Sequence, residues 1–340
     1  MNAIKRLTII VTALLLCFAL FPPNSSAQSK FKDIPNNYWA KKEIEELVSK
    51  GIINGYPDGN FKPEQYVTRA QTAIIIGKAM QIDTKYRPNP GFIDVKSKDA
   101  AYPYIAALVE RGIFSKGKKF NPNNPLTREQ LAKILVEAFA LQGTTKTEFK
   151  DVPKNHWAYK YINTIVATGI TTGKTSDKFD PTGKVTRAQM AVFVKRALDY
   201  QEKQIANLNP FVKEVVSLVN KERAKKKLPP LKLALDVTRV AQLKAEDLLK
   251  NDYFDHVSPV YGDVDTMLGK FNVKFKYAGE NIAGGQRTPE EAVTDWMNSP
   301  GHRANILDPV YTEIGVGVAI IGDENQEDPL YYWVQMFITR

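Results

Sequence analysis

One tetrapeptide pattern recurs three times along this chain at a constant interval, and the repetition constrains the fold more than any other feature. The three strings are Thr68-Arg69-Ala70-Gln71, Thr127-Arg128-Glu129-Gln130 and Thr186-Arg187-Ala188-Gln189. Successive arginines are 59 residues apart, from 69 to 128 and from 128 to 187. A fixed period of this length indicates an internal triplication of residues 31–198, in which single units are too small to bury their own apolar faces.

Each string also carries the signals that begin a helix. A threonine followed three residues later by a glutamine forms a capping box. The arginine then occupies the first helical position, where a cation opposes the helix dipole at a cost of about 0.3–1 kcal/mol. Three cations at one unfavourable position suggest that a negative group binds there. The alternative is that the arginines point sideways and pair with acidic neighbours.

The remainder of each repeat predicts a helix, a turn-rich loop and a second helix. Ile44, Leu47 and Val48 show the i, i+3, i+4 spacing of the first helix. This helix is expected to end at a glycine C-cap, which is Gly51, Gly112 or Gly169. The second helix is expected to begin at the Thr-Arg string and to run to Met80, Phe139 or Leu198.

The N-terminal 27 residues have the pattern of a secretory signal peptide. Lys5 and Arg6 precede the apolar run Leu7–Phe21, and Ser25-Ser26-Ala27 offers small residues for cleavage. We therefore expect an exported chain that begins near Gln28. No later stretch approaches the roughly 20 apolar residues that a membrane span requires, so no transmembrane segment is expected in the mature chain.

Charge and cysteine content narrow the partners and the compartment. The formal net charge is +10, which favours acidic partners. Nucleic acid is a poor candidate for an exported chain without an aromatic-plus-basic motif, and an anionic wall polymer is the better one. The single cysteine, Cys17, lies within the signal segment. An exported chain without disulfides fits a Gram-positive bacterial exoprotein.

The repeated region resembles three S-layer homology (SLH) repeats, a match carried by several motifs. Repeat one contains Phe31-Lys32-Asp33, Tyr38-Trp39-Ala40 and the loop Gly55–Phe61 in addition to the Thr-Arg string. The resemblance implies an all-α, pseudo-threefold bundle. It also implies binding to a secondary cell-wall polysaccharide that carries pyruvyl ketals, with Arg69, Arg128 and Arg187 in the carbohydrate grooves. A carboxylate suits both an arginine fork and a helix N-terminus. The expected location is the Gram-positive cell wall or S-layer surface.

The repeats depart from the family pattern in ways that predict unequal grooves. Repeat two has Ala100 where the tryptophan is expected and lacks the Tyr-Pro-Asp-Gly loop. Repeat one is therefore expected to be the most complete. Trp39 and Trp157 are interpreted as core anchors rather than as platforms for sugar rings.

Beyond the repeats, the pattern changes to one of mixed helices and strands. A capping box at Thr288-Pro289-Glu290-Glu291 predicts a helix through Trp296, and Val273–Tyr277 alternates as a strand. Residues 314–321 and 330–338 predict an antiparallel hairpin. The predicted organisation is a signal peptide (1–27), three repeats (28–90, 91–148 and 149–198), a polar linker (199–209) and an α+β domain (210–340).

The last domain resembles the CAP superfamily, which includes cysteine-rich secretory, antigen 5 and pathogenesis-related proteins. The resemblance rests on Asp255–Pro259, Gly279–Ile282 and Ser299–Leu307. It implies an α-β-α sandwich with a cleft lined by two histidines and two acidic residues. His256 and Glu280 match half of this set. Tyr332 stands in place of the strand histidine, the second glutamate falls near Ser299, and His302 is a candidate from another segment.

The three candidates His256, Glu280 and His302 allow different chemistries. They could hold a divalent metal such as zinc, or act as a general base with an orienting partner. The alternative is that they only join loops by hydrogen bonds. No serine or cysteine nucleophile has an obvious base, so enzymatic activity is uncertain. Three functions follow: a wall-anchored module that binds an unidentified lipid, glycan or peptide; a wall-tethered, metal-dependent hydrolase or protease; and a structural or adhesive module.

Overall fold

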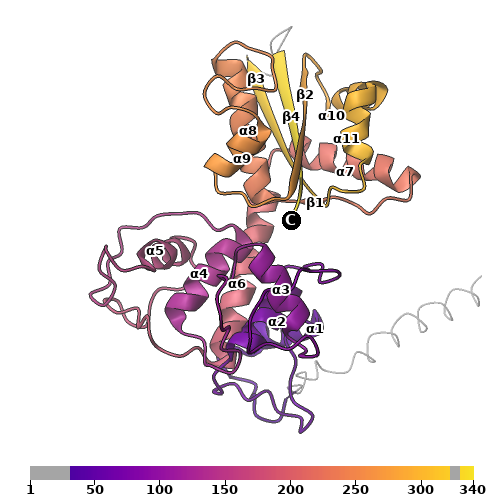
Figure 1. Cartoon of the computed structure of the whole chain (residues 1–340). Coiled ribbons are helices and arrows are strands. Elements are labelled where there is room, and N and C mark those ends of the chain that lie inside the picture. Colours follow the sequence, from indigo (N-terminus) through magenta and orange to yellow (C-terminus); the bar gives the residue numbers. More distant parts are fainter. Residues whose placement is uncertain (1–30, 322–329) are drawn as a thin grey trace, which may run out of the picture.

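Six helices, two from each repeat, form the regular structure of the first domain (Figure 1). The computed structural model describes residues 31–321 and 330–340, so the predicted signal peptide lies outside the described residues. The helices are α1 (Lys41–Ser49), α2 (Arg69–Ala79), α3 (Tyr102–Glu110), α4 (Arg128–Phe139), α5 (Tyr159–Ala167) and α6 (Arg187–Ala206).

The second helix of every repeat begins where the capping signal predicts. Thr68, Thr127 and Thr186 are the N-cap residues of α2, α4 and α6. Each threonine side chain accepts a hydrogen bond from the backbone N–H of the glutamine three residues later, whose side chain accepts one in return. The capping box is therefore present in all three repeats. The segment predicted as a linker, 199–209, is helical as far as Ala206 because α6 continues through it.

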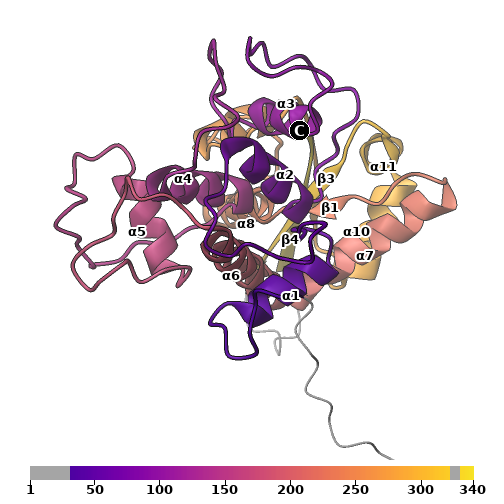
Figure 2. The ribbon, with the colours of Figure 1, turned by 90° about the horizontal axis from the view of Figure 1, so that it is seen from below.

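The repeats contact one another in a cyclic order. The first helix of each repeat packs on the second helix of the preceding one, which gives the pairs α2–α3, α4–α5 and α6–α1 (Figure 2). At the centre, the backbone N–H groups of Leu126, Val185 and Val67 donate to the carbonyls of Val67, Leu126 and Val185 respectively, at 2.9–3.0 Å. The apolar side chains of all three repeats belong to one core.

The tryptophans that precede the first helices do not belong to that core, contrary to the prediction. Trp39 is 59% exposed and Trp157 is 53% exposed. In both repeats the following alanine, Ala40 or Ala158, is fully buried instead.

The second domain contains five helices and a four-stranded sheet among the described residues. The strand order is β1-β3-β4-β2, with β1 parallel to β3 and the other pairs antiparallel. The predicted hairpin is present as β3 and β4, although the residues between them lie outside the described part. The elements are α7 (Pro210–Lys225), β1 (Lys232–Leu233), α8 (Leu235–Lys250), α9 (Val264–Lys270), β2 (Tyr277–Gly284), α10 (Pro289–Asn298), α11 (Pro300–Leu307), β3 (Glu313–Ile321) and β4 (Leu330–Thr339).

Helices cover both faces of this sheet (Figure 1). α8 and α9 pack on one face, and α7, α10 and α11 pack on the other, with a separate apolar cluster on each side. Two glycines allow α8 to lie against β3. A Cβ on Gly315 would come within 2.3 Å of the backbone of Val237, and one on Gly317 within 2.3 Å of the backbone of Ala241.

One predicted strand is displaced along the chain. β2 begins at Tyr277 rather than at Val273 and runs through Glu280. Val273 closely follows α9, its N–H donates to the carbonyl of Leu268, and its side chain belongs to the apolar cluster under α8 and α9. The alternating pattern from 273 to 277 therefore lies almost entirely before the strand.

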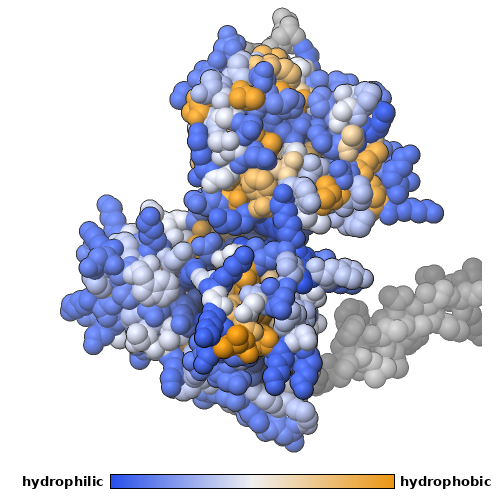
Figure 3. All heavy atoms as spheres, viewed as in Figure 1, coloured by the Kyte–Doolittle hydropathy of each residue, from blue (hydrophilic) through white to orange (hydrophobic). Residues whose placement is uncertain are grey.

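The surface of both domains is largely hydrophilic on the face drawn in Figure 3. Apolar side chains form small separate areas there. Within the described residues, no helix combines the length and the apolar character needed to cross a membrane.

Candidate functional site

The three arginines of the repeated string make the same contacts, and each contact joins one repeat to the next. The Nε atoms of Arg69, Arg128 and Arg187 donate to the carbonyls of Phe120, Phe179 and Phe61 at 2.7, 2.8 and 2.8 Å. Each guanidinium also lies over the ring of the same phenylalanine, at 4.6, 4.6 and 4.5 Å from its centre. These sites are therefore assembled between repeats and not within them.

The phenylalanine loops are held by the aspartates of the Phe-x-Asp motif. The carboxylate of Asp33 accepts hydrogen bonds from the N–H groups of Phe61 and Lys62, at 2.8 and 2.7 Å. Asp94 and Asp151 bind the equivalent loops in the same way. The residue after each phenylalanine has a positive φ, as at Lys62 (59°). The motif is visible in the sequence of each repeat, but its structural role follows only from these contacts.

The guanidinium groups lack acidic partners. Among the described residues, none of the three lies within ion-pair distance of a carboxylate, so the alternative in which they pair with acidic neighbours is wrong. Burial lowers the pKa of each arginine. The charges of nearby groups oppose this effect: Asp94 at Arg69, Asp180 and Asp151 at Arg128, and Tyr56 and Asp33 at Arg187. The Nη2 atom of Arg128 is buried without a hydrogen-bond partner. Because an arginine stays protonated, each site holds a positive charge that has no ion-pair partner among the described residues.

The surroundings of the arginines differ. Arg69 borders a cavity of about 350 Å³ whose lining includes Phe114, Ser115 and Lys133 of the second repeat and Trp157 of the third. Sequence reasoning missed Lys133 and misplaced Trp157. An aromatic residue next to a helix start does not reveal from its position alone which way it points.

Arg187, by contrast, is enclosed by its own chain. Its Nη2 donates to the carbonyl of Asn54 at 2.7 Å, in addition to the Nε bond to Phe61. The Tyr56 ring lies 4.9 Å from the guanidinium, and only 5% of the Arg187 surface is exposed. Fewer of its N–H groups remain available to a ligand than at Arg69.

In the second domain, the structure brings His256 and Glu280 together. The Nδ1 atom of His256 lies 2.8 Å from Oε1 of Glu280, which projects from β2 and is buried. The hydrogen bond to Glu280 raises the pKa of His256. The other carboxylate oxygen of Glu280, Oε2, is buried without a partner. The imidazole is exposed enough to meet a ligand, because 56% of its side-chain surface is accessible.

Polar side chains of α8, which the sequence analysis missed, fix the loop that carries His256. The Nζ atom of Lys244 donates to the carbonyls of Asp255 and His256 at 2.8 and 3.0 Å. Asp247 accepts a hydrogen bond from the Ser258 hydroxyl at 2.6 Å. Lys244 and Asp247 are both buried. Their positions on an otherwise apolar helical face are the signal that could have identified them.

His302 lies near this pair without joining it. It belongs to α11, and its pKa is lowered by burial and by the charge of His256. Its backbone carbonyl accepts a hydrogen bond from Asn281 at 3.1 Å. Over residues 31–321 and 330–340, no group of three histidine, cysteine, aspartate or glutamate side chains is arranged to hold a metal ion. His256 and Glu280 therefore form a hydrogen-bonded pair, and His302 lies apart from it.

Comparisons with protein families match both parts of the chain. The model for the cysteine-rich secretory protein family (CAP) matches residues 216–337. The model for the S-layer homology domain (SLH) matches residues 30–73, 91–132 and 148–191.

Individual relatives match one part or the other. The uncharacterized protein YkwD of Bacillus subtilis is 44% identical over 135 residues, covering 40% of this chain and 49% of the relative. The S-layer protein of Bacillus thuringiensis subsp. finitimus is 30% identical over 200 residues, covering 57% of this chain and 24% of the relative. The surface-layer 125 kDa protein of Lysinibacillus sphaericus is 36% identical over 196 residues, covering 55% and 16%. The chain thus spans half or less of the length of these relatives.

A solved structure, an extracellular protein containing a SCP domain from Bacillus anthracis, is also similar. It is 32% identical with a TM-score of 0.35, and the match covers 41% of this chain and 43% of that one.

Proposed function

Because the chain contains three S-layer homology repeats followed by a CAP domain, we propose that it is a non-covalently anchored protein of the cell surface. In this proposal the repeats bind a pyruvylated secondary cell-wall polysaccharide, and the CAP domain displays a cleft to a ligand outside the wall. The repeats and the S-layer relatives point to a secreted protein of the cell wall and S-layer surface.

The observation that carries the anchoring proposal is the set of arginines without acidic partners. A buried cation with no counter-ion is unfavourable unless a ligand supplies one. A pyruvyl ketal offers a carboxylate that accepts parallel hydrogen bonds from one guanidinium. The cyclic contacts of Arg69, Arg128 and Arg187 also support a pseudo-threefold bundle, with one groove at each boundary between repeats.

We expect the grooves to differ in strength. Trp157 precedes α5, which packs on α4 beside the Arg69 cavity. By the same cyclic order, Trp39 precedes α1, which packs on α6 near Arg128. The third groove has Ala100 at this position, and its arginine already binds two carbonyls. The order of affinity is therefore expected to be the Arg69 groove, then the Arg128 groove, then the Arg187 groove.

Sedimentation with purified wall sacculi tests this function. The exported chain is expected to pellet with sacculi that carry pyruvylated polysaccharide and to stay in solution with sacculi stripped of it. Arg69→Gln should weaken pelleting at least tenfold, whereas Arg187→Gln should change it less than threefold. Lys160→Gln, a change at an exposed residue of the first domain, is the matched control. Equal pelleting with stripped sacculi would refute the anchoring function.

For the second domain, the proposed role is ligand binding. Phe254 and Val257 are 55% and 58% exposed on either side of His256. A ligand at this site would therefore meet a titratable imidazole and an apolar surface together, which suits a molecule with a polar head and an apolar part.

A wall-tethered hydrolase is the second candidate function, favoured by the His256–Glu280 hydrogen bond. A carboxylate that orients an imidazole is the arrangement expected of a general base and its partner. If the domain is a hydrolase, His256→Ala should abolish turnover of wall fragments by the full chain. If it is a binding module, wild type and variant should show the same absence of turnover, and only ligand retention should change.

A further inference from the structure

The two domains meet where α2 and α4 of the repeated region end. Lys232 of β1 donates from Nζ to the carbonyl of Met80, the C-cap residue of α2, at 2.6 Å. Arg239 of α8 donates from Nη2 to the carbonyl of Ala140, the C-cap residue of α4, at 3.4 Å. Cations of the second domain therefore face the negative ends of helices in the first.

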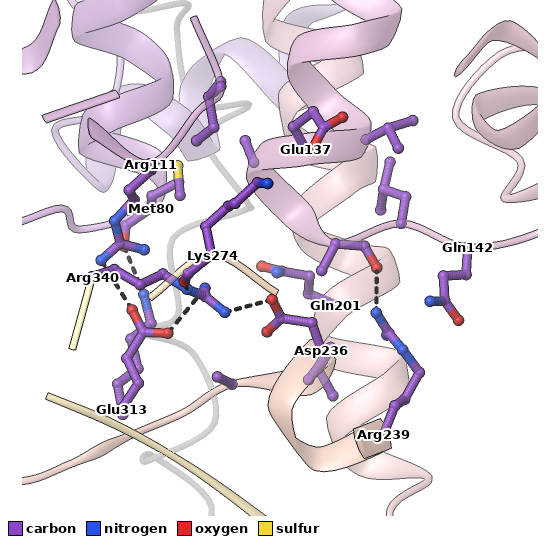
Figure 4. Close-up of a pocket in the computed structure, with 18 of the residues that line it drawn as sticks. Met80, Arg111, Glu137, Gln142, Gln201, Asp236, Arg239, Lys274, Glu313 and Arg340 are labelled. Carbon is purple, nitrogen blue, oxygen red and sulfur yellow. Dashed lines mark hydrogen bonds and ion pairs between the residues drawn. The ribbon is translucent and has the colours of Figure 1, made fainter. Parts of the chain in front are cut away.

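Ion pairs join the same surfaces (Figure 4). Glu313 lies between two arginines from different domains, at 2.9 Å from Nη2 of Arg111 and 3.0 Å from Nη1 of Arg340. Arg340 also pairs with Asp236. The carboxylates of Glu313 and Asp236 are thus already paired with Arg111 and Arg340. They are therefore less available to pair with the other cations nearby.

A cavity of about 310 Å³ lies at this boundary, and we call it the junction cavity. Residues of both domains line it, and the Lys274 side chain extends into it in Figure 4. Its charged lining residues are five cations and three anions, a surplus of two positive charges. They are Arg111, Lys232, Arg239, Lys274 and Arg340, against Glu137, Asp236 and Glu313.

Several donors in the junction cavity remain without an acidic partner. Among the described residues, no carboxylate lies within ion-pair distance of Lys232, Arg239 or Lys274. The Nε atom of Arg111 is buried without any hydrogen-bond partner. Lys232 keeps exposed surface, but desolvation by its neighbours and the charges of Arg111 and Arg340 lower its pKa, and Glu313 opposes them. A negative group inside the cavity would give these cations a partner and could accept a hydrogen bond from Nε of Arg111.

We propose that the junction cavity binds a small tetrahedral oxyanion, a phosphate or the terminal phosphoryl group of a phosphomonoester. Its charge of about −1.5 to −2 near neutral pH is close to the surplus of the lining side chains, and its oxygens accept several hydrogen bonds from lysine and arginine donors. An anion held by Arg111 of the first domain and by Lys232 and Lys274 of the second would also fix the two domains relative to each other. This site is separate from the carbohydrate grooves and does not depend on their function.

Calorimetric titration of the full chain with inorganic phosphate tests the proposal. The titration is performed at constant ionic strength with chloride as the balancing anion. One saturable site per chain is expected. Lys274→Met should weaken it about tenfold without affecting the fold, because Lys274 is exposed and makes no side-chain hydrogen bond among the described residues. Lys232→Met combined with Lys274→Met should abolish it, and Lys250→Met, at the exposed end of α8, is the control.

One further variant and a second titrant decide where the phosphate binds and which phosphate compound binds there. Arg69→Gln should leave phosphate affinity unchanged, since that arginine belongs to a groove in the first domain. Glycerol 3-phosphate as a second titrant distinguishes an ester-linked phosphoryl group from free phosphate, and saturable binding of either one supports the site. The proposal is overturned if wild type shows no saturable phosphate binding. It is also overturned if Lys274→Met and the double variant bind as wild type does, or if Arg69→Gln alone removes the binding.

Discussion

The arginine sites of the first domain and the histidine site of the second differ in where their counter-charge comes from. Arg69 and Arg128 are partly desolvated cations that form no ion pair with a carboxylate of the described residues. His256 has its carboxylate, Glu280, at 2.8 Å. Without a ligand the arginines have no ion-pair partner, whereas the histidine already has one within the chain. A ligand anion should therefore contribute much more at the arginines than at the histidine.

The largest expected effect tests whether the two regions can be disturbed separately. Gly315→Ala places a methyl group against the backbone of α8 and should destabilise the second domain by about 3 kcal/mol. Polymer binding by the first domain should persist. Chemical unfolding followed by tryptophan fluorescence, together with sacculus pelleting, measures both. Gly301→Ala is the control, because a Cβ there would meet open space. Loss of pelleting in Gly315→Ala would show that the two regions do not function separately.

Lys244→Met examines whether the histidine site is held entirely by its own domain. The change removes the donor to the carbonyls of Asp255 and His256 and should lower the free energy of unfolding by about 2 kcal/mol. The loop should become more mobile, which amide hydrogen exchange at residues 253–258 measures. Lys250→Met should have no effect. Unchanged exchange in Lys244→Met would mean that other contacts position His256.

Substitution of exposed aromatic residues tests which side chains belong to the Arg69 groove. Trp157→Ala should weaken polymer binding about fivefold, roughly 1 kcal/mol, because its ring would cover apolar sugar surface. Stability should hardly change, since the ring is 53% exposed. Tyr86→Ala, at a fully exposed tyrosine of the same domain, is the matched control. Equal affinities for the two variants would remove Trp157 from the groove.

The smallest expected effect is the change in the pKa of His256 when its partner Glu280 is replaced. Its pKa lies above the ordinary 6.5 because of Glu280, and that of His302 lies below it. Glu280→Gln should lower the pKa of His256 and bring the two values closer in an NMR titration. Because the folded-state pKa of His256 is raised, the pair stabilises the fold most below pH 6.5, and this stabilisation is lost as the pH rises through the folded-state value. In Glu280→Gln that pH dependence should disappear.

Local signals in the sequence predicted the helix starts correctly. The capping box depends on residues three apart, so Thr68, Thr127 and Thr186 identified the starts of α2, α4 and α6 without tertiary information. The hairpin of β3 and β4 was predicted by the same kind of local alternation. The proximity of His256 and Glu280 followed from a family resemblance, because a separation of 24 residues carries no geometry by itself.

Features that depend on packing between distant segments could not be predicted. The exposure of Trp39 and Trp157 depends on which of two adjacent side chains, the tryptophan or the alanine after it, is buried at the start of the helix. The enclosure of Arg187 depends on the carbonyl of Asn54, which is 133 positions away. The hydrogen bonds from Lys244 to the carbonyls of Asp255 and His256 could not be predicted, because the sequence does not show where this loop crosses α8. Sequence patterns specify elements and repeats, whereas the completeness of a site is decided by contacts of this kind.

Calorimetry with two wall oligosaccharides that differ only in the pyruvyl ketal tests the central claim most directly. If the unpaired guanidinium groups of the repeats bind the ketal carboxylate, removal of pyruvate should weaken binding to the full chain at least tenfold, about 1.4 kcal/mol. In Arg69→Gln, the groove that contains residue 69 should bind the oligosaccharides with and without pyruvate equally well. Equal affinity of the wild-type chain for the two oligosaccharides would contradict the claim.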